Sequence, residues 1–344
     1  MRSEGYSLIE LMVAMALGVL LLSGVLAVFL GSRATYETTD RLSRVQDNGR
    51  FALDSIVRDI RAAGYLGCSR RAPLTVSLGS PDTLQWDFSQ ALQGFDAEDS
   101  GWSPGFDQQV LVTDLDSGPT LGSDVLVVHM PRAEFVEPVR VLEGSLMTAT
   151  TDGIQTEDTS ESRLRAGDIV QISDCNARSI FQVEANTAGV IAHGKVAPDY
   201  DRNLPGNSSA DLDWAYTDTA ELMALQSAVY YVSTASSTAA GTSLWRLSSG
   251  NGAPEELVEG VENMQLAFGE ASTGEFVYRR ADEVTDWSQV KSVRIALLVR
   301  SMSQYGTDVD NTSYQLLDET IAAPGDRHLR QVFTTTVNIR NDPS

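Results

Sequence analysis

The sequence has few of the side chains from which catalytic and metal sites are built. Its 344 residues include three histidines and two cysteines. The histidines, His129, His193 and His328, form no metal-spaced pair, and Gly250-Asn251-Gly252 is a turn signal instead of a phosphate-binding loop. We therefore expect no catalytic residue, no metal centre and no cofactor, and we expect that the protein is not an enzyme.

Basic side chains are also in deficit. The chain has 47 Asp and Glu against 25 Lys and Arg, a formal net charge of -22 and a pI of about 4.4. A surface of this sign repels phosphate backbones and anionic lipid headgroups. Direct binding of nucleic acid is therefore disfavoured, whereas the hydrophobic content of 42% suffices for one large core or two small ones.

Charge is absent from one long stretch near the N-terminus, Leu11 to Gly31. As a helix rising ~1.5 Å per residue, this stretch spans roughly 30 Å, the thickness of the hydrocarbon core of a bilayer. The charged segment before it is shorter than in an ordinary secretory signal, and Glu10 lies at the edge of the apolar run. A carboxylate at that depth is costly unless it is paired, so the pattern predicts a functional role for Glu10.

The hexapeptide Gly-Tyr-Ser-Leu-Ile-Glu at 5–10, joined to this apolar run, resembles the signal of type IV prepilins. The resemblance implies that a membrane aspartyl peptidase cuts after Gly5 and methylates the new N-terminus on Tyr6, where the family usually has Phe. It also implies a cytoplasmic N-terminus and a pairing of Glu10 with the N-terminal amine of a neighbouring subunit. The alternative is a plain single-span anchor in which Gly5, Tyr6 and Glu10 are incidental.

A helical pattern continues beyond the apolar run. Apolar residues recur at steps of three and four from Leu42 to Ala63, while charged residues, Asp59 among them, occupy the other faces. No proline precedes Pro73, so nothing enforces a sharp kink. We predict one long helix, apolar in its first half and amphipathic in its second, that ends between Gly64 and Gly67.

From Pro73 onward the sequence consists of short runs rich in Val, Ile, Leu, Thr and aromatic residues, separated by residues that favour turns. We expect a largely antiparallel sheet against which the helix lies, and hence an α+β fold. The predicted strands are 74–78, 110–113, 125–130, 135–142, 169–173, 180–184, 228–233, 244–247, 264–268, 290–300 and 329–340. Polar tracts at 95–107, 148–163, 198–213 and 233–242 are predicted loops, the last a candidate for disorder.

Several later blocks resemble the PilW family of minor pilins when they are taken in order. They are Ala-Gly-Tyr-Leu-Gly-Cys at 63–68, Gly-Asp-Ile-Val-Gln-Ile-Ser-Asp-Cys at 167–175, Val-Glu-Gly-Val-Glu-Asn-Met-Gln-Leu at 258–266 and Phe-Thr-Thr-Thr-Val-Asn-Ile-Arg-Asn at 333–341. The resemblance runs from residue 5 to the C-terminus, interrupted by variable loops.

This resemblance implies a type IV pilin-like fold with four parts. They are a leader at 1–5, a membrane and filament-core helix at 6–31, its amphipathic continuation at 32–67, and a β-rich periplasmic domain at 68–344. The implied protein is anchored in the inner membrane and enters the extracellular pilus.

The implied function is that of a minor pilin that primes a type IV pilus at or near its tip. The implied partners are prepilin peptidase, other minor pilins, the major pilin and a tip adhesin. One alternative is a J-type pseudopilin of a type II secretion system. A second is a membrane-anchored sensor or hydrolase with a pilin-like anchor.

The two cysteines are Cys68 and Cys175. An even pair in an exported chain is usually a disulfide, because the periplasm is oxidising. Closing a loop of about 107 residues is worth roughly 4 to 5 kcal/mol in the chain-entropy model. The alternative is a pair of buried free thiols.

Two acidic loops are weak candidates for calcium. Asp308, Asp310 and Asn311 form one run of oxygen-bearing side chains, and Asp114, Asp116 and Ser117 form another. Neither loop has the twelve-residue spacing that ends in Glu, so solvated loops are the preferred interpretation.

Overall fold

A long helix and several β-sheets make up the molecule, which is described here from a computed structural model. The structure describes residues 8–65, 72–79, 85–106, 118–132, 137–160, 163–199, 204–239, 241–249, 253–272, 275–304, 306 and 308–341. The predicted strand at 110–113 lies outside these residues.

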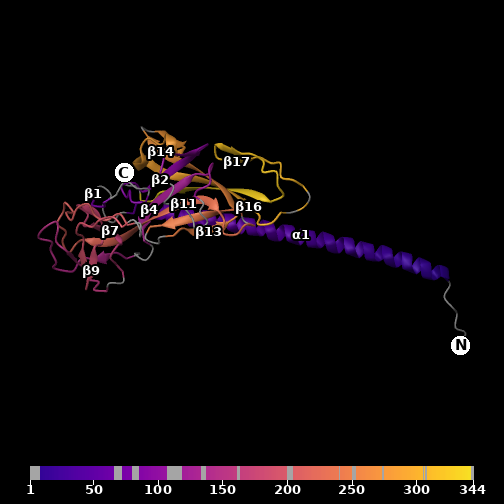
Figure 1. The fold of residues 1–344 in the computed structure, drawn as a ribbon, viewed down its shortest axis with the longest axis horizontal. Coiled ribbons are helices and arrows are strands. Elements are labelled where there is room, and N and C mark those ends of the chain that lie inside the picture. The colour runs from indigo at the N-terminus through magenta and orange to yellow at the C-terminus, as the bar shows by residue number, and fades with distance from the viewer. Residues whose placement is uncertain are drawn as a thin grey trace, which may run out of the picture.

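Helix α1 (Leu8–Ala62) is a single element of 55 residues, about 82 Å long at 1.5 Å per residue. Its first half projects away from the β-rich body, and its second half lies against that body (Figure 1). Gly64 follows with φ of +67°, a left-handed conformation that ends helices and that glycine adopts without strain. The predicted long helix is therefore confirmed, and it ends at Ala62, just before the predicted range.

The largest sheet is organised around β11 (Glu221–Thr234). The first half of β11 pairs with β7 and β5, and its second half pairs with β12 and β4. The other strands of this sheet are β1 (Leu74–Val76), β2 (Leu92–Glu98), β3 (Gly101–Ser103), β4 (Val125–Pro131), β5 (Val139–Arg140), β7 (Ile169–Ser173), β8 (Arg178–Gln182), β12 (Thr242–Ser248) and β13 (Glu255–Glu259). Among the described pairings of this sheet, β1 with β8 is the parallel one.

A second, antiparallel sheet has the order β15-β14-β16-β19. Its strands are β14 (Val261–Ser272), β15 (Glu275–Arg279), β16 (Val290–Arg300) and β19 (Arg330–Asn338), with short 3-10 turns at Ala281–Glu283 and Trp287–Gln289. Two smaller groups complete the described strands: β6 (Ile154–Gln155), β9 (Ala185–Thr187) and β10 (Val190–Ala192), and the hairpin of β17 (Tyr314–Leu316) with β18 (Glu319–Ile321).

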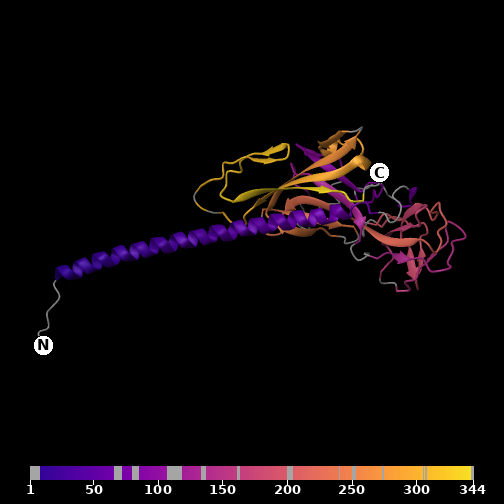
Figure 2. The ribbon, with the colours of Figure 1, turned by 180° about the vertical axis from the view of Figure 1, so that it is seen from behind.

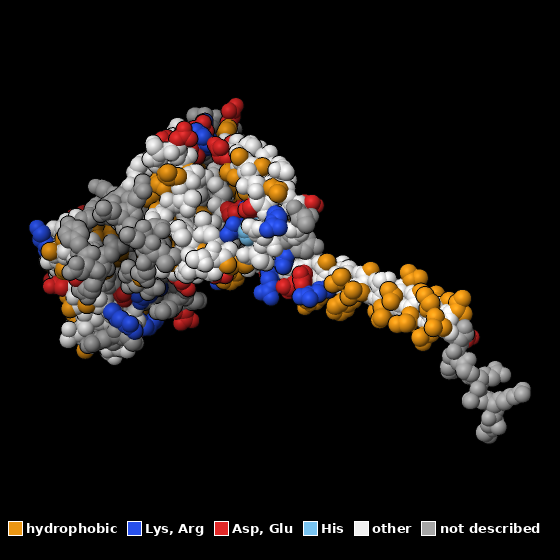
Figure 3. All heavy atoms as spheres, turned by 45° about the vertical axis from the view of Figure 1, so that its right-hand side comes forward, with side chains coloured by type: hydrophobic (Ala, Val, Ile, Leu, Met, Phe, Trp, Pro, Cys, Tyr) orange, Lys and Arg blue, Asp and Glu red, His pale blue; other side chains and the backbone are white. Residues whose placement is uncertain are grey.

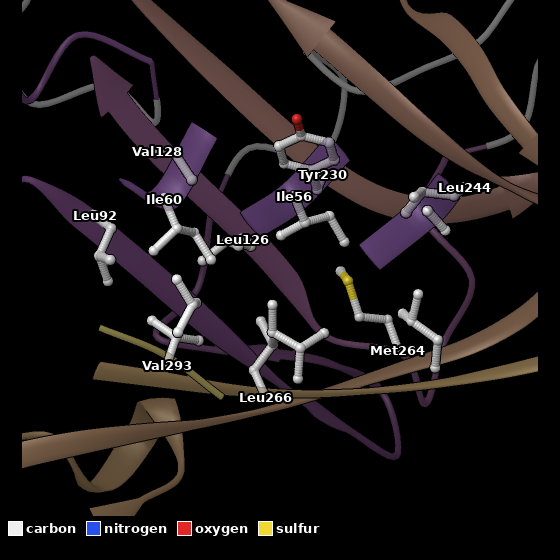
Figure 4. Packing of buried hydrophobic residues seen from close by; sticks show 14 of the residues in the cluster. Ile56, Ile60, Leu92, Leu126, Val128, Tyr230, Leu244, Met264, Leu266 and Val293 are labelled. Carbon is white, nitrogen blue, oxygen red and sulfur yellow. The ribbon is translucent and has the colours of Figure 1, made fainter. Parts of the chain in front are cut away.

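The main hydrophobic core lies where α1 meets both sheets. Ile56 and Ile60 of α1 are fully buried and share one cluster with Leu126, Leu266 and Val293. Figure 4 shows these side chains meeting between the helix and the strands. A separate cluster, which includes Phe181 of β8, fills the part of the body built by 137–225. We call residues 137–225 the distal lobe, and residues 92–132 with 226–341 the helix lobe.

Most predicted strands are confirmed within a few residues, and the mixture of a long helix with antiparallel sheet is confirmed. The predicted strand at 135–142 is reduced to Val139–Arg140 among its described residues, and β8 begins two residues before the predicted 180–184. Seven further strands were not predicted: β6, β9, β10, β13, β15, β17 and β18.

The predicted loop at 95–107 is wrong, and the one at 148–163 contains the two-residue strand β6. The tract 95–107 contains most of the β2–β3 hairpin, because Phe95 and Trp102 are buried in a cluster with β4 and β11. The predicted loop at 233–242 is confirmed between its end residues: it connects β11 to β12, and its described part is closed by a hydrogen bond from the amide of Ala235 to the carbonyl of Gly241.

Candidate functional site

The first half of α1 has no packing partner in the body. An 18-residue window of this helix has a mean hydropathy of 2.7 and none of its residues is buried, so the helix is long and apolar enough to cross a membrane. Figure 3 shows its hydrophobic side chains covering the projecting part of the helix, with charged side chains gathered where the helix reaches the body. Apolar surface of this extent requires lipid or other helices around it.

Glu10 lies in the first turn of α1 and is exposed. It is flanked by exposed apolar side chains, including Ile9 and Leu11. An acidic residue in the first turn is favoured by the helix dipole, because the amide groups there carry partial positive charge. The predicted processing residues Gly5 and Tyr6 lie outside the described residues, so the cleavage site remains a prediction from the sequence.

The second half of α1 is held against the helix lobe by close packing. Val45, Gly49 and Ala52 are buried on the face that meets the body. A Cβ atom at Gly49 would overlap the ring of Phe333, so glycine lets this ring of β19 lie directly against the helix backbone. Figure 2 shows this half of α1 lying along the body.

A polar contact inside this interface sets the rotation of the helix. Asp59 of α1 accepts hydrogen bonds from the hydroxyl of Tyr230 at 2.6 Å and from the guanidinium of Arg246 at 2.8 Å. Burial raises the pKa of Tyr230 above its ordinary value, so the phenol stays protonated and donates. The sequence pattern puts Asp59 on a face other than the apolar one, but its partners on β11 and β12 were not predicted.

Backbone carbonyls supply two further attachments. Asn48 donates to the carbonyl of Glu259 at 3.0 Å, and Asn341 donates to the carbonyls of Arg61 and Ala63 at 3.3 Å. The second contact satisfies acceptors that the helix end leaves free. Side chains of α1 and residues from the far end of the chain thus hold helix and body together.

The segment where α1 leaves the body is charged on its surface. Arg33 pairs with Glu37 at 3.0 Å and Arg44 pairs with Asp40 at 3.0 Å, each four residues apart. These exposed pairs are worth a few tenths of a kcal/mol each, as i,i+4 pairs usually are. They mark the end of the apolar stretch and the start of the solvated part of the helix.

The structure places the weak calcium candidate Asp310 in an ion-pair cluster. Its carboxylate accepts from Tyr314 at 2.8 Å and from Arg330 at 3.2 Å. Arg330 is 1% exposed and also contacts Asp326 and Glu262 at 2.6 Å each. Within the described residues no group of three His, Cys, Asp or Glu could hold a metal ion.

The remaining calcium candidates differ from Asp310 in their surroundings. Asn311 donates to the carbonyl of Val309 at 3.3 Å, and Asp308 and Asn311 both lie on exposed loop backbone. Asp114 and Asp116 lie outside the described residues. We therefore attribute the role of Asp310 to its contact with Arg330, which no local sequence pattern reveals.

The three histidines are held by backbone carbonyls. His193 lies between the carbonyls of Asp152 and Ala210 at 2.7 and 3.0 Å, and His328 contacts the carbonyl of Ser301 at 2.7 Å. Nδ1 of His129 contacts the carbonyl of Gln90 at 2.9 Å, and burial lowers the pKa of His129 to about 4. Each contact is structural.

Cys175 follows β7 and has φ of +69°, whereas Cys68 lies outside the described residues. The parallel pairing of β1 with β8 aligns Leu74 with Arg178. Leu74 is six residues after Cys68 and Arg178 is three residues after Cys175. This register is compatible with the predicted disulfide, which remains a prediction.

Two family models match the chain. The model described as Type IV Pilus-assembly protein W matches residues 229–341, and the model described as the prokaryotic N-terminal methylation motif matches residues 1–26. Comparison with curated proteins and with solved structures finds no match. The first match begins in β11 and covers the strands of the helix lobe from β12 to β19, and the second covers the start of α1 with Gly5, Tyr6 and Glu10.

Proposed function

The chain is a minor pilin of the PilW family of type IV pilus-assembly proteins, and we propose that it primes pilus assembly from a position at or near the tip. The observation that carries the proposal is α1 itself. The apolar half of α1 is exposed and does not pack against the body, while the other half packs against the helix lobe. A helix of this kind is suited to pass from lipid into a bundle of similar helices.

The proposed sequence of events begins with processing. Prepilin peptidase cuts after Gly5 and the new amino group of Tyr6 is methylated. The mature protein is then anchored in the inner membrane by a single helix, with the helix lobe and distal lobe in the periplasm. These steps rest on the methylation motif at 1–26 and on the exposed apolar helix.

Glu10 has the central role in the proposed assembly step. As α1 leaves the membrane for the filament, the carboxylate of Glu10 meets the N-terminal amine of a neighbouring subunit. A helix bundle excludes water as lipid does, so opposite charges attract more strongly there than in solution. Since a misplaced charge would remain unpaired, this pair selects one register between neighbouring helices.

The attachment of α1 to the body gives the filament its outer surface. Asp59, Tyr230 and Arg246 hold the helix at one rotation, so the register of α1 also determines where the body lies. Other minor pilins, the major pilin and a tip adhesin are the proposed partners of that surface. In the structure the distal lobe lies at the end of the body away from the projecting helix (Figure 1).

Deletion and complementation test this function. We expect a strain lacking the gene to make few or no surface pili, and the wild-type gene to restore them, with the protein present in sheared pili at far below the amount of major pilin. Piliation that is unchanged by the deletion would contradict the proposal. Unchanged piliation together with failed export of secreted enzymes would instead identify a J-type pseudopilin.

A further inference from the structure

A small pocket lies where the end of α1 meets both lobes. It has a volume of about 60 Å³. By the same measure a water molecule needs about 10 to 15 Å³, so the pocket has room for a molecule of a few non-hydrogen atoms. Its lining is mostly apolar, with Tyr65, Leu74, Phe88, Met130 and Leu225 around it.

Two polar side chains in the pocket wall each have a nitrogen atom without a hydrogen-bond partner. Arg178 is 6% exposed, and its Nε and Nη2 both donate to the carbonyl of Ala72, while Nη1 has no hydrogen-bond partner. His129 is 4% exposed, and its Nε2 has no partner either. Both residues line this pocket. A buried donor left in this state is costly, so the site favours a molecule that completes it.

Arg178 also has no carboxylate partner among the residues that the structure describes. Every other strongly buried arginine that the structure describes has a carboxylate: Arg330 contacts Glu262 and Asp326, and the part-buried Arg246 contacts Asp59. No carboxylate lies within ion-pair distance of Arg178 among the described residues. Burying a cation without a counter-ion is unfavourable, and an anion in the pocket would relieve it.

The protonation state of His129 determines which anion can bind in the pocket. Its Nδ1 carries the proton that bonds the Gln90 carbonyl, so Nε2 of the neutral ring is an acceptor and requires a donor. The groups around the ring are Asp87 and the backbone of Gln90 and Gln85, which favour its protonated form, and Arg178 and Tyr65 in the pocket wall. A carboxylate bound together with one proton satisfies both sides.

We propose that this pocket binds a short-chain carboxylic acid, of the size of formic or acetic acid, between Arg178 and His129. One oxygen accepts from Nη1 of Arg178. The proton lies between the carboxyl group and Nε2 of His129, and the methyl group or hydrogen faces the apolar wall. Because the pocket joins Gly64 at the end of α1 to β4 and β8, occupancy strengthens the junction of helix and lobes.

Thermal denaturation of the full-length protein in detergent tests this proposal. Sodium formate or acetate replaces sodium gluconate at constant ionic strength, since gluconate carries the same carboxylate but exceeds the pocket. We expect a saturable rise in Tm with formate and acetate, with half-saturation in the millimolar range because so few atoms are in contact. No saturable rise would mean that the pocket holds water only, and it would overturn the proposal.

Variants locate the effect. Arg178→Gln should abolish the rise, whereas Arg246→Gln, which removes an arginine that already has a carboxylate, should retain it. If Arg178→Gln fails to fold, Ala91→Leu fills the pocket without removing the charge and should also abolish the rise. An undiminished rise in Arg178→Gln or in Ala91→Leu would overturn the assignment.

The pH dependence provides a readout that a merely structural arginine would not give. Burial lowers the pKa of His129 to about 4, so in the empty pocket Nε2 of His129 carries no proton at neutral pH. Uptake of one proton with each carboxylate means that half-saturation needs about tenfold less formate at pH 6 than at pH 7. An equal requirement at both pH values would overturn the proposed partnership of His129 with the acid.

Discussion

The hydroxyl of Tyr230 donates to the carboxylate of Asp59 across 2.6 Å, joining the central strand of the large sheet to the helix. Arg246 from the next strand donates to the same oxygen at 2.8 Å, so charge and hydrogen bond are both satisfied. A helix packed by apolar side chains alone could rotate or slide by small amounts at little cost. This polar contact, in contrast, is satisfied at one rotation of α1, which is the property that a filament subunit needs.

Removal of the Tyr230 hydroxyl should weaken the helix interface. We expect Tyr230→Phe to lower the free energy of unfolding by about 1 to 2 kcal/mol, because it leaves Asp59 with one donor fewer. Tyr231→Phe is the matched control, since the hydroxyl of Tyr231 is buried without a hydrogen-bond partner. Denaturant unfolding measures both variants, and equal losses for the two would contradict the role given to the Asp59 contact.

Gly49 should resist any side chain. We expect Gly49→Ala to destabilise the protein by about 1 to 3 kcal/mol, because the added methyl meets the Phe333 ring and one of them must move. Gly31→Ala is the control, since a Cβ there meets nothing within 4 Å. The Tm of each variant is the measurement, and Phe333→Leu combined with Gly49→Ala should recover part of the loss if the clash is the cause.

Arg330 should be the residue that secures the loop after β16. We expect Arg330→Gln to cost about 3 kcal/mol, because it leaves Asp326, Glu262 and Asp310 close together without their cation. Calcium and chelator should leave the Tm of the wild-type protein unchanged. A rise in Tm with calcium would restore the calcium interpretation of Asp310.

The same cluster predicts a pH dependence. Hydrogen bonds from Arg330 hold the pKa of Asp326 well below its usual range. A carboxyl whose pKa is lowered by folding stabilises the protein fully above its unfolded value of about 4, and this stabilisation is lost as the pH falls further. The stability difference between wild type and Arg330→Gln should therefore be constant from pH 7 to 5 and shrink below pH 4.

The sequence reveals those elements whose pattern is local. Leu42 to Ala63 repeats with the helical period and 290–300 alternates with the strand period, so α1 and β16 were predicted close to their observed bounds. The β2–β3 hairpin was missed because its acidic residues resemble a loop. Asp96 is buried there, and it lies 3.6 Å from Arg280, a partner that follows it by 184 residues.

The candidate site divides in the same way. Glu10 was proposed as a functional residue because a carboxylate beside an apolar run is unusual whatever the fold. Asp59 and Arg330 were not found, because their roles depend on partners from other strands that no spacing rule connects to them. Local chemistry thus predicted the processing and assembly signal, whereas the residues that position the helix became evident only from the folded chain.

Loss of the predicted disulfide should loosen the junction behind α1. We expect Cys68→Ser, Cys175→Ser and the double variant to lower the Tm to similar extents, because each would open the same loop of about 107 residues and return its entropy to the unfolded chain. Thiol labelling of the unfolded, non-reduced wild type should modify neither cysteine. Modification of both would show two free thiols and refute the pairing.

Substitution of Glu10 gives the most direct test of its proposed role in assembly. We expect Glu10→Ala to be processed and folded normally but to be depleted from sheared pili, with piliation reduced in a strain that lacks the wild-type copy. The substitution stabilises the helix in lipid by roughly 2 to 3 kcal/mol, so failed insertion would not account for the loss.

Glu10→Gln should behave similarly, since it keeps the size of the side chain and removes its charge. Glu37→Gln is the control, because it removes a carboxylate from the same helix outside the apolar stretch, and it should support normal piliation. Wild-type piliation by Glu10→Ala would show that neighbouring subunits find their register without this pair, and Glu10 would then serve only the processing signal.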